Sequence, residues 1–389
     1  MSSCWAAPLR RAVLGVAVLL SIAAAAPAAE RAEVGFAGVA YTGAAAGSGE
    51  RLPHASAVLG RIGLQAYARR LRDALERTPA RHISWAPAER LQVLDGSGAS
   101  LVMAVALDRE TVTQERIDGR WKVLYELAGQ ALFFDFREKQ VLFAYPLTLQ
   151  YIDMFDAPPT EAALEAMAAR VLDGTGPGRL PEVTAAELAS LSLPNASSRR
   201  LQVVGTRLSD LAAGKLAPGQ RDAALVGHEF TKILASTLRL PMLPHAAGQA
   251  IGGVMPARFA DGSVHQLRIP EPDYRIDVTV EDLRDKTLSQ QGGFRQQLYG
   301  AFFHVTVSEP LSGRIYLDQP LRQGSTKAIP GSQDIVDSSG AYYETLLAGF
   351  ASLAQSLDGG AKPWASEQTG GRVFTQQLKS LKELVQQCR

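Results

Sequence analysis

Side chains that could do chemistry are few in this sequence, and their spacing completes no familiar motif. His228 and Glu229 match the start of the His-Glu-x-x-His motif, in which two histidines one helical turn apart bind zinc. The second histidine would stand at position 232, which holds Lys232. Helical spacing therefore places a lysine beside His228, and we predict no metal site here.

Neither a nucleophile nor a phosphate-binding loop is indicated. The Asp-Gly-Ser-Gly segment at residues 95–98 lacks the Gly-x-Ser-x-Gly pattern of a strained serine nucleophile and has the composition of a turn. Residues 248–253 contain glycines but no Lys-Ser/Thr pair, which favours a surface loop. The sequence supports neither acyl transfer nor a phosphate cradle.

Paired carboxylates and clustered aromatic residues are also interpreted as structural rather than functional residues. Two carboxylate pairs lie beside arginines on faces that we expect to be exposed, Asp282 with Asp285 and Glu161 with Glu165. Five aromatic residues cluster, and we assign them to a core rather than to base stacking: Phe133, Phe134, Phe136, Phe143 and Tyr145. We predict no catalytic, cofactor-binding or metal-binding residue and no cofactor. A hydrolase site assembled from distant residues stays open.

The first residues have the order of a secretory signal. Arg10 and Arg11 precede an apolar run over residues 12–26, and the small-residue sequence Ala26-Pro27-Ala28 follows. We expect residues 1–28 to be a signal peptide cleaved after Ala28. The run of about 15 residues is shorter than the roughly 20 that cross a bilayer. The mature chain is expected to be periplasmic or secreted, with no transmembrane segment.

Cysteine content and net charge argue against an internal disulfide and against nucleic acid as a binding partner. Cys4 leaves with the signal peptide, so the mature chain keeps Cys388 alone and cannot form an internal disulfide. Loss of two arginines changes the formal net charge from +1 to −1 (+1 − 2 = −1). A near-neutral chain has no electrostatic reason to bind nucleic acid.

Two stretches repeat one pattern. Residues 121–151 alternate as two long strands around a charged turn, and residues 296–322 form a second hairpin of the same kind. Aligning Pro146 with Pro320 also aligns Asp135 with Glu309. A strand precedes each hairpin and a helix follows it. We therefore predict an α+β, sandwich-like fold of two tandem copies of a strand-helix-strand-three-strand meander-helix unit, plus a C-terminal amphipathic helix.

The composition of the connecting segments indicates where each expected domain begins and ends. After the signal peptide at 1–28 we expect a first repeat at 33–173, a linker with a short helix at 174–198, a second repeat at 199–358, and a flexible segment with a C-terminal helix at 359–389.

Three local interpretations concern the linker and the second repeat. The sequence Thr184-Ala-Ala-Glu187 matches a capping box that would start the linker helix. Residues 246–268 have the composition of a loop that lengthens the second repeat, after a short strand at 240–245. The helix at 372–387 has one apolar face, which either packs on the second repeat or docks another chain.

The order of elements resembles the α/β domain of periplasmic envelope proteins. The residues that carry the resemblance are the strand start Asp273–Val278, the hairpin turn at residues 307–315 and its first-repeat counterpart at 134–141. The family includes CsgG, the N-terminal domain of TolB and LpoB-type activators. The resemblance implies a non-catalytic protein that binds other envelope components, and it transfers no site residues. This chain lacks a lipid-attachment cysteine at the cleavage site.

The sequence therefore predicts an exported, non-catalytic protein that binds envelope proteins of unknown identity, in an assembly or accessory role. The alternative is a small-ligand binding protein with its site between the two repeats, since clefts between domains commonly hold ligands. The sequence leaves the oligomeric state undetermined.

Overall fold

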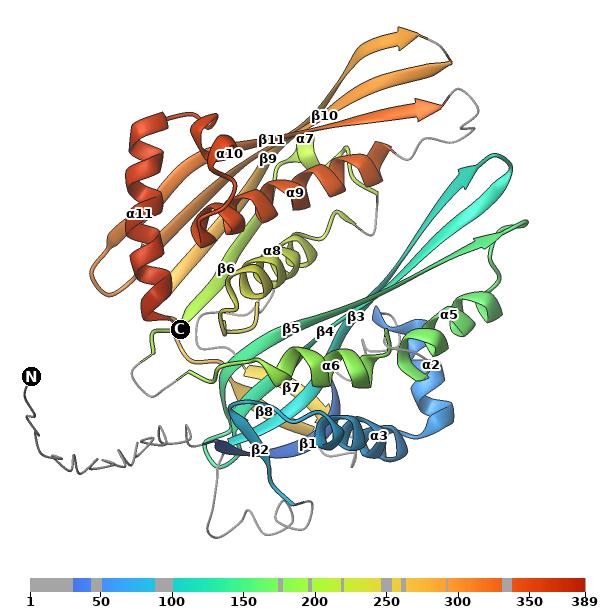
Figure 1. Cartoon of the computed structure of the whole chain (residues 1–389), viewed down its shortest axis with the longest axis vertical. Coiled ribbons are helices and arrows are strands. Elements are labelled where there is room, and N and C mark those ends of the chain that lie inside the picture. Colours follow the sequence, from blue (N-terminus) through green and yellow to red (C-terminus); the bar gives the residue numbers. More distant parts are fainter. Residues whose placement is uncertain are drawn as a thin grey trace, which may run out of the picture. The chain divides into compact units, whose positions relative to one another are not determined.

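Helices packed against two mixed β-sheets make up the α+β fold of the computed structural model (Figure 1). The structure describes residues 31–42, 51–87, 101–173, 178–194, 198–217, 220–245, 254–259, 264–291, 293–330 and 338–388. The predicted signal peptide, the Asp-Gly-Ser-Gly segment and the glycines at 248–253 lie outside these residues. We call residues 31–194 the N-terminal half and residues 198–388 the C-terminal half.

The N-terminal half is built on a sheet of order β2-β1-β3-β4-β5-β8-β7. Its strands are β1 (Ala32–Thr42), β2 (Ile83–Trp85), β3 (Leu101–Ile117), β4 (Arg120–Asp135), β5 (Gln140–Phe155), β7 (Val254–Phe259) and β8 (Val264–Arg268). Strand β1 pairs parallel to β3, and β3, β4 and β5 form the antiparallel meander. Asp118 (φ 50°) and Gly119 (φ 78°) turn β3 into β4, as a two-residue hairpin requires.

Four helices cover one face of this sheet: α2 (Pro53–Ile62), α3 (Leu64–Arg77), α5 (Glu161–Asp173) and α6 (Leu180–Ala189). The periodic apolar residues of α3 and α5 are buried, among them Tyr67, Leu71 and Met167. Thr78, which precedes Pro79, ends α3 in an extended conformation. The side-chain oxygen of Thr160 accepts the Ala163 N–H at 3.2 Å and begins α5.

The C-terminal half has a four-stranded sheet of order β11-β10-β9-β6. Its strands are β6 (Leu201–Leu208), β9 (Tyr274–Gln291), β10 (Phe294–Glu309) and β11 (Arg314–Pro330). The helices are α7 (Asp210–Ala213), α8 (Ala223–Leu238), α9 (Ser338–Asp358), α10 (Lys362–Ser366) and α11 (Gly371–Gln387). Helices α8, α9 and α11 lie along one face of the sheet (Figure 1).

The two meanders share their register. Gln130 pairs with Pro146 and His304 with Pro320, a constant offset of 174 residues (304 − 130 = 320 − 146 = 174). The bulge after Phe133 in β4 recurs after Val307 in β10 at the same offset. Strands β1 and β6 both pair parallel to the first strand of their meander.

The segment predicted as a loop at 246–268 contains two strands, and this prediction was wrong for them. Strands β7 and β8 pair with each other and join the N-terminal sheet, because β7 pairs with β1 and β8 pairs with β5. The buried Leu267 and Ile269 thereby cover Leu132 and Phe134, on the face of the sheet opposite α2, α3, α5 and α6. The strands are short and their partners lie in the other half, so no local pattern reveals them. The strand expected at 240–245 is reduced to one bridge, between Met242 and Ala144 of β5.

The capping box predicted at Thr184 was also wrong. Helix α6 begins after Arg179, with Pro181 in its first turn, and Thr184 lies inside it with no exposed surface. Proline is favoured in the first helical turn, where a missing N–H costs nothing. Leu180, Ala185 and Leu188 pack into the core of the N-terminal half.

The C-terminal helix packs on its own half. Phe374, Leu378, Leu381 and Val385 of α11 are buried in the core formed with α8 and α9. Of the two roles considered for its apolar face, packing on the second sheet is the one observed, and the face is not free to dock another chain.

Close packing of α9 on β10 predicts the effect of one substitution. A Cβ atom at Gly349 would lie 2.7 Å from Cε1 of the buried Phe303 ring and 3.1 Å from Cβ of Gln323. Overpacking costs about 1–3 kcal/mol, and the gain in helix propensity returns about 1 kcal/mol. We expect Gly349→Ala to lower the free energy of unfolding in urea. Gly60→Ala in α2, where nothing lies within 4 Å of the new Cβ, is expected to raise it.

Candidate functional site

His228, the residue nearest to a metal motif, lies where the two halves meet. Its Nε2 atom is 3.9 Å from Oδ2 of Asp108 on β3, and both atoms are buried without a hydrogen-bond partner. Lys232, one turn along α8, forms an ion pair with Glu229 and lies 3.8 Å from Glu126 of β4. Among the described residues no group of three or more His, Cys, Asp or Glu side chains could hold a metal ion.

Asp108 is the extra residue at a bulge between β3 and β4, and its side chain is 13% exposed. Its Oδ1 atom accepts hydrogen bonds from the Thr42 hydroxyl at 2.5 Å and from Nε2 of Gln130 at 3.2 Å. Burial raises the pKa of the Asp108 carboxyl, although His228, Thr42 and Gln130 act in the opposite direction. Such perturbed carboxyls also occur in structural networks.

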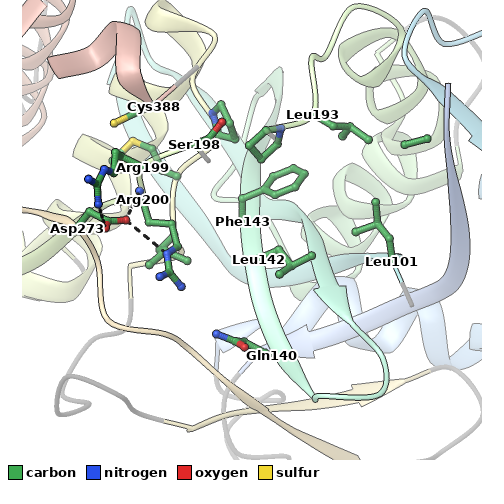
Figure 2. A pocket seen from close by; sticks show the side chains of 15 residues that line it. Leu101, Gln140, Leu142, Phe143, Leu193, Ser198, Arg199, Arg200, Asp273 and Cys388 are labelled. Atoms are coloured by element: carbon green, nitrogen blue, oxygen red, sulfur yellow. Dashed lines mark hydrogen bonds and ion pairs between the residues drawn. The ribbon is translucent and has the colours of Figure 1, made fainter. Parts of the chain in front are cut away.

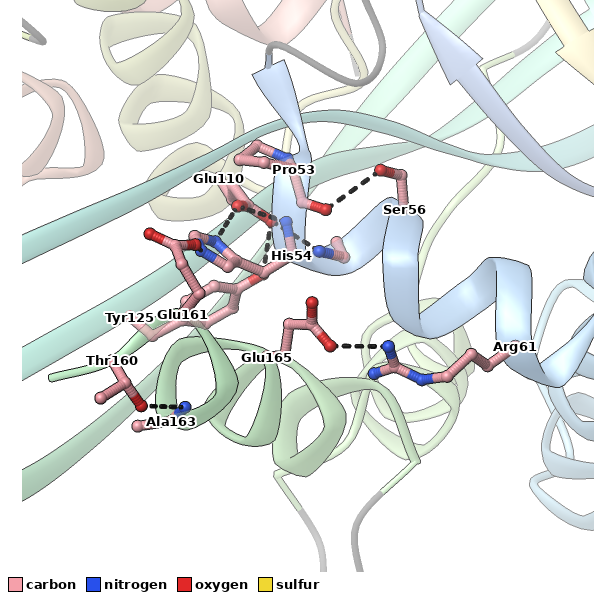
Figure 3. Close-up of polar contacts among 11 residues, drawn as sticks. Pro53, His54, Ser56, Arg61, Glu110, Tyr125, Thr160, Glu161, Ala163 and Glu165 are labelled. Carbon is pink, nitrogen blue, oxygen red and sulfur yellow. Dashed lines mark hydrogen bonds and ion pairs between the residues drawn. The ribbon is translucent and has the colours of Figure 1, made fainter.

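Figure 3 shows a second polar cluster, which fastens helix α2 to β3. The Glu110 carboxylate accepts the backbone N–H groups of His54 (2.9 Å) and Ala55 (2.8 Å) and the Tyr125 hydroxyl (2.8 Å). The His54 ring lies between two carboxylates, 2.5 Å from Glu110 and 2.9 Å from Glu161. Glu110 therefore caps α2 from outside the helix, in place of the N-cap residue Leu52, which offers no side-chain acceptor. This cluster is structural.

Beyond Ala144, the edge of strand β5 that faces away from β4 pairs with no other strand of the described residues, and we take it as the candidate site. The N–H and C=O groups of Ala144 face away from β4 and bond to Met242. In an antiparallel strand the backbone N–H and C=O groups of every second residue point to the same edge. The residues that share the edge of Ala144 are therefore Pro146, Thr148, Gln150, Ile152 and Met154. Among the described residues the one hydrogen bond to that edge beyond Ala144 is local, from the Met154 N–H to Oδ1 of Asp153 at 2.8 Å.

A groove of about 420 Å³ follows this edge, and we call it the β5 groove. Its floor is the strand from Tyr145 to Gln150, and its walls come from α6 (Val183 and Glu187) and α8 (Lys232 and Ser236). The Thr148 hydroxyl in the floor is buried and has no hydrogen-bond partner. Buried polar atoms are normally bonded, so this hydroxyl marks a place where an acceptor or donor is missing.

At one position the corresponding edge of β11 is closed by the chain itself. At the offset of 174 residues, Thr148 corresponds to Arg322 (148 + 174 = 322). The Arg322 N–H donates to Oε1 of Gln368 at 2.8 Å, and its C=O accepts from Nε1 of Trp364 at 3.1 Å and Nε2 of Gln368 at 3.2 Å. Side chains from the α10 segment thus replace a neighbouring strand.

The difference between the two edges lies in that segment. Tyr145 contacts Glu187 of α6 at 3.2 Å, and Gln319, at the same offset, contacts Gln377 of α11 at 2.8 Å. Helices α6 and α11 therefore take comparable places beside their sheets. Among the described residues of the N-terminal half, nothing occupies the place of Trp364 and Gln368, and the β5 groove is there.

Comparison with known proteins adds no assignment, because no family model and no curated protein matches the chain. No helix within the described residues is long and apolar enough to cross a lipid bilayer.

Sequence reasoning did not identify the β5 groove, although one signal was present. Pro146 and Pro320 occupy equal places in the two hairpins, and proline in a long strand indicates an edge. The alignment therefore marked both edges, but the side chains that close one of them come from residues 364 and 368, outside the repeat.

Proposed function

We propose that this protein is an exported binding protein whose β5 groove receives an extended segment of an envelope protein. The observation that carries the proposal is the contrast between two corresponding edges: the Arg322 backbone is bonded by Gln368 and Trp364, whereas the Thr148 backbone and hydroxyl are not. Addition of a segment to an exposed sheet edge is a recurring mode of peptide recognition.

Features common to the two meanders support the comparison of the two edges. Both sheets contain a parallel strand followed by a three-strand meander, and the register of the last two strands and the bulge after Phe133 and Val307 repeat at the offset of 174 residues. We infer that a single unit was copied and that the second copy alone acquired the closing segment. The resemblance to CsgG, TolB and LpoB-type domains, which the sequence indicated, agrees with a non-catalytic role and remains a proposal.

The groove defines the chemistry of the segment it would bind. Pro146 offers only its C=O, whereas Thr148 and Gln150 offer both backbone groups, so a bound segment must be extended and must carry a free N–H opposite Pro146. Ile152 (55% exposed) and Met154 (38% exposed) favour apolar side chains farther along.

Photo-cross-linking at matched positions tests this proposal. A photoreactive amino acid replaces Gln150 at the open edge or Gly324 at the corresponding position of β11, two residues from the closed Arg322 (150 + 174 = 324), and irradiation is carried out in the native cells. We expect adducts with an exported protein at position 150 and none at position 324. Thr148→Pro, which removes one outward N–H without removing a bond to β4, should abolish the adduct at position 150.

Three outcomes contradict the proposal. They are equal adducts at positions 150 and 324, adducts that persist in the folded Thr148→Pro variant, and an adduct of twice the chain mass as the main product. The last would indicate that two copies pair through β5. Circular dichroism of each variant establishes that it is folded.

A further inference from the structure

A second groove runs between the two halves and joins an apolar wall to a pair of arginines (Figure 2). Its volume is about 860 Å³, within the range of roughly 300–1,000 Å³ typical of small-molecule sites. The wall is formed by Leu101, Leu142, Phe143, Pro241, Met242 and Leu243. Arg199, Arg200 and Asp273 lie together on one side, as Figure 2 shows.

Leu142 is aimed into this groove by a bulge. The β4–β5 register passes from Phe143 to Val141 and leaves Leu142 unpaired, with 37% of its surface exposed. Bulges commonly redirect a side chain towards a binding site. The corresponding residue of the C-terminal half is Tyr316 (142 + 174 = 316), which packs edge to face on Tyr274 at 5.6 Å. Leu142 has no such aromatic cover among the described residues.

The two arginines differ in how far Asp273 engages them. Asp273 accepts Nη1 of Arg199 at 3.0 Å and the backbone N–H of Arg200 at 2.8 Å. These bonds lower the pKa of the Asp273 carboxyl, although its partial burial acts the other way. The Arg200 guanidinium approaches Asp273 only through Nε at 3.6 Å, and its side chain is 43% exposed. Its terminal nitrogens therefore remain available for a second carboxylate.

Cys388 also lines this groove and adds an uncharged side chain. The residue is 1% exposed, and burial raises the pKa of its thiol to about 12. At neutral pH the thiol is protonated and behaves as a small apolar group. The groove thus combines an apolar wall with one incompletely paired guanidinium.

We propose that this groove binds an amphipathic carboxylate of the fatty-acid class, with its chain along Leu142 and Phe143 and its carboxylate on Arg200. This site is separate from the β5 groove, so failure of one proposal does not decide the other. An alcohol of equal chain length would keep the apolar contacts and lose the ion pair.

Titration calorimetry of the full chain with laurate and with dodecanol, both below their aggregation limits, tests the assignment. We expect laurate to bind with a negative heat-capacity change and about tenfold more tightly than dodecanol, since one charge-assisted bond is worth a factor of that order. Arg200→Gln should remove that preference and leave dodecanol binding unchanged. Leu142→Asp should abolish binding of both, and Arg207→Gln, on β6 outside the groove, should change neither.

The assignment is overturned if laurate shows no saturable binding to the wild-type chain. It is also overturned if the Arg200→Gln and Arg207→Gln variants bind laurate equally, or if Leu142→Asp leaves the affinity intact. Both Leu142 and Arg200 are partly exposed, so the variants are expected to fold, which far-ultraviolet circular dichroism verifies.

Discussion

Replacing Glu110 by alanine is expected to lower the free energy of unfolding by about 3–5 kcal/mol, the range seen when one partner of a buried charged network is removed. The Glu110 side chain is only 3% exposed. Its removal leaves the N–H groups of His54 and Ala55 and the Tyr125 hydroxyl without an acceptor. Denaturant unfolding of the purified chain measures the loss, which is large because three donors lose one carboxylate together.

Glu161 provides the matched control for this substitution. It also bonds to His54, at 2.9 Å, but its side chain is 86% exposed. Exposed pairs contribute about 0–1 kcal/mol, so Glu161→Ala should have little effect. Equal losses for the two variants would mean that capping of α2 is not the reason for the stability that Glu110 supplies.

Replacing Asp108 by asparagine is expected to raise stability at neutral pH, by about 1–3 kcal/mol on the scale of buried ionic groups replaced by neutral ones. Asparagine keeps the oxygen that accepts from Thr42 and Gln130. It removes a charge whose Oδ2 atom has no hydrogen-bond partner and lies 3.9 Å from His228. Thermal unfolding at pH 7 measures the gain.

The pH dependence follows from the direction of the Asp108 shift. The folded pKa is raised, so between the unfolded value near 3.9 and the folded value the native state holds the extra proton. The free energy of unfolding therefore falls as pH rises through that window, and the penalty is complete above it. The advantage of Asp108→Asn should be absent near pH 3 and should grow towards neutrality.

Glu281 is the control, because it is the extra residue at the corresponding bulge of β9 and its side chain is 48% exposed. Glu281→Gln should leave stability nearly unchanged at every pH. A loss of stability in Asp108→Asn at pH 7 would show that attraction to His228 outweighs the cost of burial.

Local sequence patterns predicted the elements that depend mainly on the residues within them. The long hairpins at 121–151 and 296–322 and the C-terminal helix at 372–387 follow from alternation and helical spacing, and the structure confirms each. The predictions that failed depend on distant partners. Strands β7 and β8 exist because β1 and β5 accept them, and Thr184 lies within α6 because Pro181 starts that helix earlier.

The candidate site could be predicted only in part for the same reason. The proline alignment marked two sheet edges, but the state of each depends on side chains far along the chain: Gln368 and Trp364 reach Arg322 across more than 40 residues. No spacing rule links such positions. The contrast between the two corresponding edges becomes visible only once both sheets are folded.

Residue-resolved amide hydrogen exchange, on the free chain and on its complex with the protein captured through position 150, tests the central claim most directly. In the free chain the Arg322 N–H, which bonds to Gln368, should exchange slowly, whereas the Thr148 and Gln150 N–H groups should exchange rapidly although they lie in a long strand. In the complex, exchange at Thr148 and Gln150 should slow while Arg322 is unchanged. Rapid exchange at Thr148 and Gln150 in the complex would contradict binding along the β5 edge.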